Sequence, residues 1–156
     1  EDPSLPCIAA LLEAIPPEGD VPIFVYSRTY EEGRLRELGE RHPQHAPQLA
    51  RLIDRLVDLL PLVRQSYYHP DMRGSFSIKK VLPTIAPDLG YGELGGVTDG
   101  AAAQVAYLYA VFEPGMTAER KEAYRRELLR YCERDTWAMV EVAWWLERRG
   151  RPPASA

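Results

Sequence analysis

The last third of the chain carries the clearest pattern of apolar and polar positions. Between Glu127 and Arg148 apolar residues recur at spacings of three and four, which places them on one face of an α-helix: Leu128, Tyr131, Cys132, Met139, Val142, Ala143 and Leu146. Asp135 falls on the same face, one turn after Tyr131. Because a carboxylate on a core-facing stripe loses hydration, it needs hydrogen-bond donors, a cation or a bound metal.

The rest of the pattern predicts further helices and one strand. Residues 21–26, VPIFVY, form a β-branched and aromatic run without helical period, which is typical of a buried strand. Thr29 and Glu32 have the spacing of a capping box, so a helix should begin near Tyr30 and run to about Arg41. Other helices are expected over residues 4–15, 48–60, 78–82, 101–112 and 118–149. Residues 57–63 could instead hold a short strand, and Pro61 should stop any helix there.

Caps and breakers set the expected ends of the later helices. Ser77 should cap a short helix that ends at Pro83, and Thr117 should cap the last helix. Thr98 or Asp99 should cap the helix over residues 101–112. The glycine-rich segment 86–100 should be a loop.

A strand that leads directly into a capped helix is half of an α/β unit. One confident strand cannot make a sheet, so the other strands are either missing from this chain or supplied by a partner. We expect one domain over residues 1–150, followed by a frayed tail over residues 151–156. A sheet left incomplete would have exposed edges, through which the chain could form a homodimer.

Composition narrows the functional classes. The chain has 156 residues and a formal net charge of −4, whereas a non-specific nucleic-acid binder is usually basic. Any nucleic-acid role must therefore come from a local patch or a metal site. No run is long enough to span a membrane, and two cysteines, with Cys132 expected to be buried, fit a reducing cytoplasm. Because the chain begins with Glu1 rather than Met, we expect it to be a piece of something longer.

Two acids and a tyrosine are the first candidates for chemistry. Tyr131 and Asp135 are four residues apart and share one helical face, so the hydroxyl could position a water while the carboxylate holds a divalent cation. The alternative is a structural hydrogen bond between the two, or a pairing of Asp135 with Arg130 or Arg134. Glu31 could be a second metal ligand at the carboxyl end of a strand, or simply a favourable acid at a helix N-terminus.

A basic cluster provides candidates for binding phosphate. Lys79, Lys80 and Arg73 lie beside Ser75 and Ser77, and could contact phosphates or form a solvated face. His69 could be a metal ligand or part of a turn, and the three tryptophans Trp137, Trp144 and Trp145 could be core or a docking surface.

Three segments together resemble a known family: VYSRTYEEGRLREL, VDLLPLVRQSYYHPDMRGSFSIKKVLPTIAPDLGY and LLRYCERDTWAMVEV. They are similar to the bacterial family described as domain of unknown function 2779, and the likeness extends from about Pro3 to Leu146. That family resembles the ribonuclease H-like 3′–5′ exonucleases, which use two divalent metals. The resemblance implies an α/β fold of that type, here helix-rich because its N-terminal strands are missing.

The exonuclease pattern assigns roles to residues of this chain. Tyr131 and Asp135 match its Tyr-x-x-x-Asp motif, as water-positioning hydroxyl and metal ligand. Ser27 stands in the asparagine position of the second motif and Glu31 in its acid position, as a further metal ligand. The segment SFSIKKVLP resembles the one that lines the substrate groove, which makes Lys79 and Lys80 phosphate contacts. The first motif, Asp-x-Glu, is absent from the chain.

The resemblance therefore implies Mg²⁺- or Mn²⁺-dependent hydrolysis of a DNA or RNA 3′ end in a longer parent protein, with this chain incomplete or inactive alone. The alternative is a non-catalytic nucleic-acid-binding or protein-interaction module that kept the fold without the chemistry. A third possibility is a purely helical structural domain, in which residues 21–26 are buried without pairing to another strand.

Overall fold

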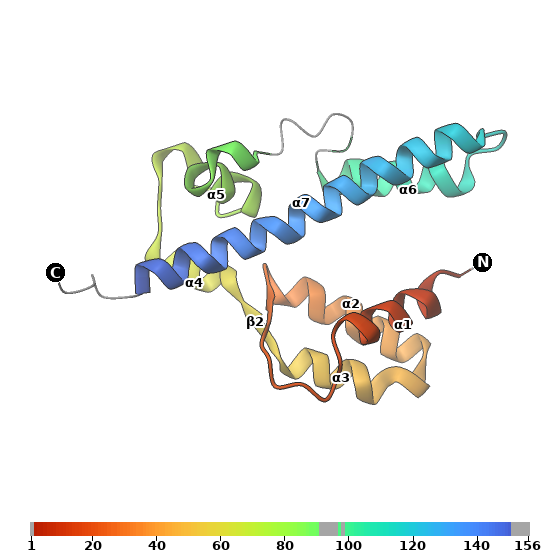
Figure 1. The fold of residues 1–156 in the computed structure, drawn as a ribbon, viewed down its shortest axis with the longest axis horizontal. Helices are drawn as coiled ribbons and strands as arrows, with labels where there is room; N and C mark the ends of the chain where they lie inside the picture. The colour runs from red at the N-terminus through yellow and green to blue at the C-terminus, as the bar shows by residue number, and fades with distance from the viewer. Residues whose placement is uncertain (1, 91–96, 98, 151–156) are drawn as a thin grey trace. The chain divides into compact units, whose positions relative to one another are not determined.

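The computed structural model describes residues 2–90, 97 and 99–150 (Figure 1). The chain divides into two compact units, Glu1–Ser66 and Tyr67–Ala156. The single domain expected over residues 1–150 is thus described here as two separate units. The tail 151–156, the loop residues 91–96 and Thr98 lie outside the described residues.

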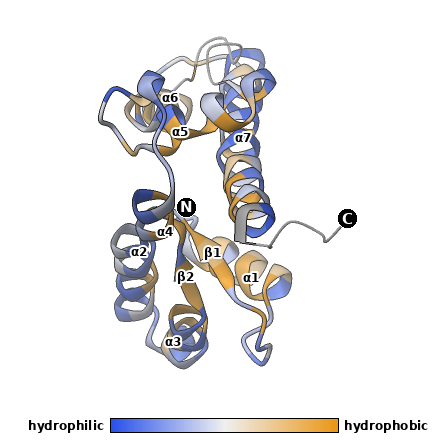
Figure 2. Cartoon of the chain, turned by 90° about the vertical axis from the view of Figure 1, so that its left-hand side faces the viewer, coloured by the Kyte–Doolittle hydropathy of each residue, from blue (hydrophilic) through white to orange (hydrophobic). Residues whose placement is uncertain are grey.

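The first unit contains a pair of parallel strands joined through helices. Its elements are α1 (Ser4–Ala14), β1 (Ile23–Val25), α2 (Arg28–Arg41), the 3₁₀ turn η1 (Pro43–His45), α3 (Ala46–Asp54), β2 (Leu56–Asp58) and α4 (Leu59–Ser66). Strand β1 pairs with β2 from Ile23↔Leu56 to Val25↔Asp58, and Figure 2 shows β1 as hydrophobic and β2 as hydrophobic over part of its length. Parallel strands need a crossover connection, which α2, η1 and α3 provide. Ile8, Leu49 and Leu52 form a core cluster of this unit.

The single helix predicted over residues 48–60 is wrong. A short strand does form here, but over Leu56–Asp58 and not over residues 57–63, most of which belong to α4. Helix α3 ends at Asp54, and the next residues form β2 because Leu56 pairs with Ile23 of β1. The amphipathic period continues through this segment, so it cannot reveal that pairing. Pro61 does not stop a helix either: it lies in the first turn of α4, where its missing N–H has no helical partner to lose.

The capping box predicted at Thr29 is also wrong. Helix α2 begins at Arg28, and Ser27 occupies the capping position with φ 76° and no capping bond from its side chain. The carboxylate of Asp58 caps the helix instead, accepting the backbone N–H groups of Ser27 at 3.0 Å and Arg28 at 2.9 Å. Glu32 forms ion pairs with Arg28 and Arg36.

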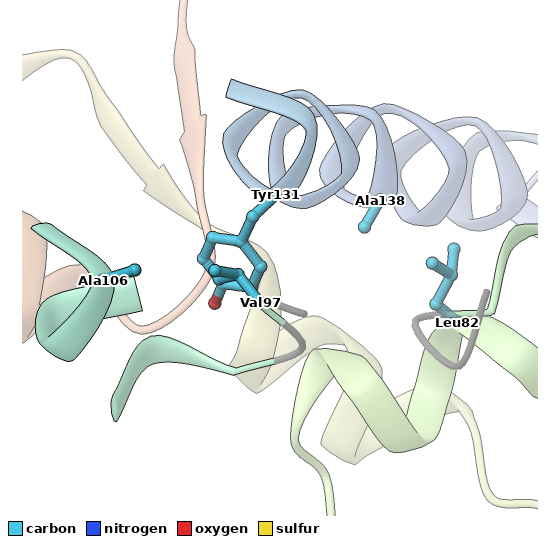
Figure 3. Close-up of a cluster of buried hydrophobic side chains, with 5 residues drawn as sticks. All are labelled: Leu82, Val97, Ala106, Tyr131 and Ala138. Atoms are coloured by element: carbon cyan, nitrogen blue, oxygen red, sulfur yellow. The ribbon is translucent and has the colours of Figure 1, made fainter. Parts of the chain in front are cut away.

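The second unit is organised along one long helix. Its elements are the 3₁₀ turn η2 (Pro70–Met72), α5 (Ile78–Ile85), the 3₁₀ turn η3 (Pro87–Leu89), α6 (Gly100–Phe112) and α7 (Ala118–Gly150). Both α5 and α6 pack against α7, and Figure 1 shows α6 running alongside it. The buried cluster between these helices consists of Leu82, Val97, Ala106, Tyr131 and Ala138 (Figure 3).

The helix caps predicted at Asp99 and Thr117 are confirmed in this unit. Asp99 caps α6 by accepting the Ala102 N–H at 2.8 Å, and Thr117 Oγ1 accepts the Arg120 N–H at 3.3 Å at the start of α7. Ser77 precedes α5, but its side chain makes no capping bond. Pro83 does not end α5, which continues to Ile85 because Val81 and Leu82 anchor it in the core.

Cys132 is exposed, which corrects the expectation of a buried thiol. The buried stripe of α7 runs through Tyr131, Ala138 and Val142, and Cys132 lies to one side of it. In the described part of the chain, no helix combines the length and the apolar character that crossing a membrane requires.

Candidate functional site

Tyr131 and Asp135 form a hydrogen-bonded pair on α7. The Tyr131 side chain is 9% exposed and belongs to the core cluster. Burial, together with the hydrogen bond to Asp135 and the charge of that carboxylate, raises the pKa of the Tyr131 hydroxyl above its ordinary value. The hydroxyl therefore stays protonated and donates to Asp135. This is the structural hydrogen bond that the sequence left open as an alternative to a catalytic role.

Three helices meet at the ring of Tyr131. Lys79 of α5 lies over it, with its Nζ 5.1 Å from the ring centroid, in the range of a cation–π contact. The first residue of α6, Gly100, lies so close that a side-chain carbon there would be 4.0 Å from the Tyr131 hydroxyl oxygen. The Ala102 N–H holds the pKa of the neighbouring Asp99 below its ordinary value, with Lys79 acting more weakly in the same direction. The pair is thus surrounded by one cation and one further acid.

The other basic candidates are placed differently. Lys80 is exposed, one residue beyond Lys79 on α5. Arg73 is exposed at the end of η2, in the left-handed conformation with φ 50°. His69 accepts the Asp71 N–H at Nδ1 over 3.3 Å, which fits the role of a turn residue. Of the predicted phosphate contacts, Lys79 is the one that the structure brings to Tyr131.

Ser27 and Glu31 belong to the first unit, whereas Tyr131 and Asp135 belong to the second. Glu31 lies half-buried in the first turn of α2, where an acid is favourable next to the positive end of the helix dipole. The residue that accepts backbone hydrogen bonds at this helix terminus is Asp58, at the carboxyl end of β2. Its carboxylate also accepts the Leu60 N–H at 3.0 Å. Sequence reasoning missed Asp58 because the segment was assigned to a helix. The signal available was its position directly after the apolar pair Leu56–Val57.

Tyr26 lies directly after β1 and two residues before the start of α2. Burial raises the pKa of Tyr26 to about 12, with Arg64 opposing the shift and Asp58 adding to it. Its hydroxyl therefore remains protonated at all physiological pH values.

The described residues do not supply a complete set of ligands for a metal ion. Among the described residues, no three His, Cys, Asp or Glu side chains converge so that they could hold a metal ion. Two-metal hydrolysis needs carboxylates that clamp two cations about 4 Å apart. Asp135 and Glu31 stand in different units, so the described residues of neither unit fit a pair of metal ions by themselves.

A hollow on α7 was not anticipated from the sequence. It has a volume of about 500 Å³ and is lined by Leu89, Arg130, Glu133, Arg134 and Trp137. Arg134 Nη1 donates to the Gly90 carbonyl at 3.2 Å. The exposed indole of Trp137 packs edge-on against Trp144, with ring centroids 5.8 Å apart. The spacing of Arg130, Arg134 and Trp137 at four and three residues was the signal for a shared face.

In comparisons with known proteins, a family model matches the first part of the chain and a distant relative matches most of it. The family described as "Domain of unknown function (DUF2779)" matches residues 1–77. The "Uncharacterized protein UU173" of Ureaplasma parvum serovar 3 is 28% identical over 142 residues, covering 80% of this chain and 20% of that protein. The chain thus spans about a fifth of the length of this relative. No solved structure matches the chain significantly.

Proposed function

We propose that this chain is part of a nucleic-acid-processing domain of the ribonuclease H-like 3′–5′ exonuclease type, and that alone it binds a single strand without hydrolysing it. The observation that carries the proposal is the hydrogen-bonded Tyr131–Asp135 pair with Lys79 over the tyrosine ring. The similarity of the chain to that enzyme class supports it, because the same Tyr-x-x-x-Asp spacing recurs there.

The roles of the residues follow from their positions. Lys79 carries a positive charge to the edge of the core beside Tyr131, where it can attract a phosphate. Tyr131 keeps its proton and holds the Asp135 carboxylate in a fixed orientation. In a parent protein that supplies further acids, Asp135 would be the ligand that this unit contributes to Mg²⁺ or Mn²⁺, the ions that such chemistry uses to activate a water. Glu31, in the first unit, remains a metal ligand only as the resemblance predicts it. Arg73 and Lys80 of the same unit are further proposed contacts to the strand, and Ser27 of the first unit is a substrate contact only as the resemblance predicts it.

The binding part of the proposal is tested with a fluorescent single-stranded oligonucleotide with a free 3′ hydroxyl, by fluorescence anisotropy at low salt. We expect Lys79→Ala to weaken binding about tenfold, the order of one lost charge-assisted contact. Lys121→Ala is the matched control, since it removes the same charge from an exposed position of α7 that takes no part in the proposed contacts. Absence of binding, or equal losses for the two variants, contradicts the role given to Lys79.

The catalytic part needs a chain that includes an Asp-x-Glu strand. We expect such a chain to shorten a labelled strand from its 3′ end when Mn²⁺ is present, and Asp135→Asn to abolish cleavage. Calorimetric titration of Mn²⁺ into the same chain measures metal binding separately. A folded chain of this kind that neither binds Mn²⁺ nor cleaves would reject the enzymatic proposal and leave only the binding role.

The second candidate is a non-catalytic single-strand-binding module, which the hollow beside Trp137 favours. Arginine side chains next to an exposed indole combine charge with a stacking surface, as single-strand-binding proteins do. Trp137→Ala should then weaken oligonucleotide binding more than Lys79→Ala does. Leu129→Ala is the control, because Leu129 is a similarly exposed large apolar residue of α7, at 53% against 44% for Trp137, and does not line the hollow.

A further inference from the structure

Helix α6 is apolar around almost its whole circumference, yet among the described residues it packs on one side, against α7. Among its residues, Ala106 is buried against α7. The large apolar side chains that remain exposed are Val105, Tyr107, Leu108, Tyr109, Val111 and Phe112, the last with 70% of its surface in solvent. A helix that is hydrophobic all round is normally buried on all sides. The exposed side of α6 therefore has the composition of an interface.

The exposed side contains a seam of the kind that packs against another helix. Ala101, Val105, Leu108 and Phe112 follow one another at spacings of four, three and four, which is the heptad spacing of a helix-to-helix seam. No charged residue stands between residues 100 and 112. Val105, Leu108 and Phe112 line a shallow hollow of about 370 Å³ together with Tyr109 and Glu113. An uncharged, apolar helix fits this surface.

We propose that the occupant is α6 of a second copy of this chain, packed antiparallel about a two-fold axis. The seam has the smaller side chains at its N-terminal end, Ala101 and Val105. The larger ones, Leu108 and Phe112, stand at its C-terminal end. An antiparallel arrangement centred between residues 106 and 107 sets Phe112 against the partner's Ala101. It also sets Leu108 against the partner's Val105, so that large meets small in each layer, as close packing requires.

A parallel arrangement lacks this match, because it sets Phe112 against Phe112 at one end and Ala101 against Ala101 at the other. The antiparallel pairing makes the surface complementary to itself, which is the requirement for a two-fold interface.

The surface is presented on a fixed helix. Asp99 caps the N-terminus of α6, and Tyr109 stacks on Tyr124 of α7, with ring centroids 6.4 Å apart. A preorganised surface loses less entropy on association. The helix is 13 residues long, about 20 Å, and one helix pair buries less than the roughly 800 Å² per partner of a standard interface. We therefore expect a dissociation constant in the micromolar range.

Sedimentation equilibrium of the whole chain over a concentration series tests the proposal. We expect a reversible monomer–dimer equilibrium that Val105→Glu weakens by at least about tenfold, since it buries a charge in an apolar layer. Val21→Glu is the matched control, because Val21 is an exposed valine of the first unit. It should leave the equilibrium unchanged. Circular dichroism of each variant confirms that it is folded.

The size match is tested by exchanging the two ends of the seam. Ala101→Phe alone should weaken the dimer, because it sets Phe against Phe112, and Phe112→Ala alone should weaken it by leaving a gap. The double variant should recover the dimer, because large again meets small. Unspecific association predicts the opposite for Ala101→Phe, which adds exposed apolar surface and would then strengthen self-association.

Cross-linking fixes the direction of the helices. In chains whose exposed Cys7 and Cys132 are replaced by serine, a mixture of Val105→Cys and Leu108→Cys should form a disulfide-linked dimer far faster than either variant alone. A chain that stays monomeric up to millimolar concentration, or a variant that cross-links preferentially to itself, overturns the proposal. Neither result bears on oligonucleotide binding, which is measured independently.

Discussion

The two units hold their helices in different ways. In the first, the N-terminus of α2 is capped by Asp58, about 30 residues further along the chain. Arg28 of the same helix reaches the carbonyls of Leu56 at 3.0 Å and Ile53 at 3.3 Å. In the second unit, α6 and α7 are capped by residues directly before them, Asp99 and Thr117. Local caps can be recognised in a sequence, whereas a cap supplied by a distant strand cannot.

Tryptophan provides a means of measuring the two units separately. All three tryptophans, Trp137, Trp144 and Trp145, lie in the second unit. Their fluorescence therefore follows unfolding of that unit, while far-ultraviolet circular dichroism follows the helices of both. The following predictions use this difference, in order of expected effect.

The largest effect is expected from Asp58→Ala. It removes the acceptor of three backbone N–H groups, those of Ser27, Arg28 and Leu60, and should lower the free energy of unfolding of the first unit by about 2–3 kcal/mol. Urea unfolding should show the loss by circular dichroism and leave the tryptophan transition in place. Asp54→Ala, at an exposed acid four residues earlier, should change little. A shift of the tryptophan transition would show that the units unfold together.

A smaller effect in the other unit is expected from Asp99→Ala. The substitution removes one capping bond, from the Ala102 N–H, and should lower the urea midpoint of the tryptophan transition by about half the shift that Asp58→Ala causes in the first unit. Asp88→Ala is the control, because Asp88 is an exposed acid of the same unit. Equal effects of the two variants would contradict the capping role of Asp99.

The smallest effect at neutral pH is expected from Tyr26→Phe. Burial raises the pKa of Tyr26 from 10.0 to about 12, so the unfolded chain releases this proton at lower pH than the folded chain does. The contribution of Tyr26 to stability is therefore complete below pH 10 and is lost as the pH rises from 10 to about 12. Urea midpoints followed by circular dichroism should fall less steeply above pH 10 in Tyr26→Phe. Tyr30→Phe, at an exposed tyrosine, should leave the slope as it is.

The sequence predicts those elements whose signals are local. Helices α1 and α7 agree with their apolar periods, and α6 agrees with its predicted cap. The strand at Ile23–Val25 agrees with its β-branched run, although it is shorter than predicted. The errors occur where a distant contact decides the conformation. Leu56–Asp58 becomes a strand because β1 is available to pair with it, and α2 has a different cap because Asp58 reaches it.

The same distinction applies to the site. The four-residue spacing places Tyr131 and Asp135 together, and their hydrogen bond agrees with it. The contact of Lys79 with the tyrosine ring depends on how α5 packs against α7, which no spacing within one helix reveals. The burial of Cys132 was predicted wrongly, since the residue is exposed. Apolar character alone does not show where the buried stripe of a helix ends.

The backbone at Ser27 bears on which residues this position accepts. Its φ of 76° lies in the left-handed region, which asparagine enters more readily than serine does. Because the N–H of residue 27 is already held by the Asp58 carboxylate, Ser27→Asn would leave the main chain where it is. Asparagine should therefore replace serine at this position without rebuilding the turn.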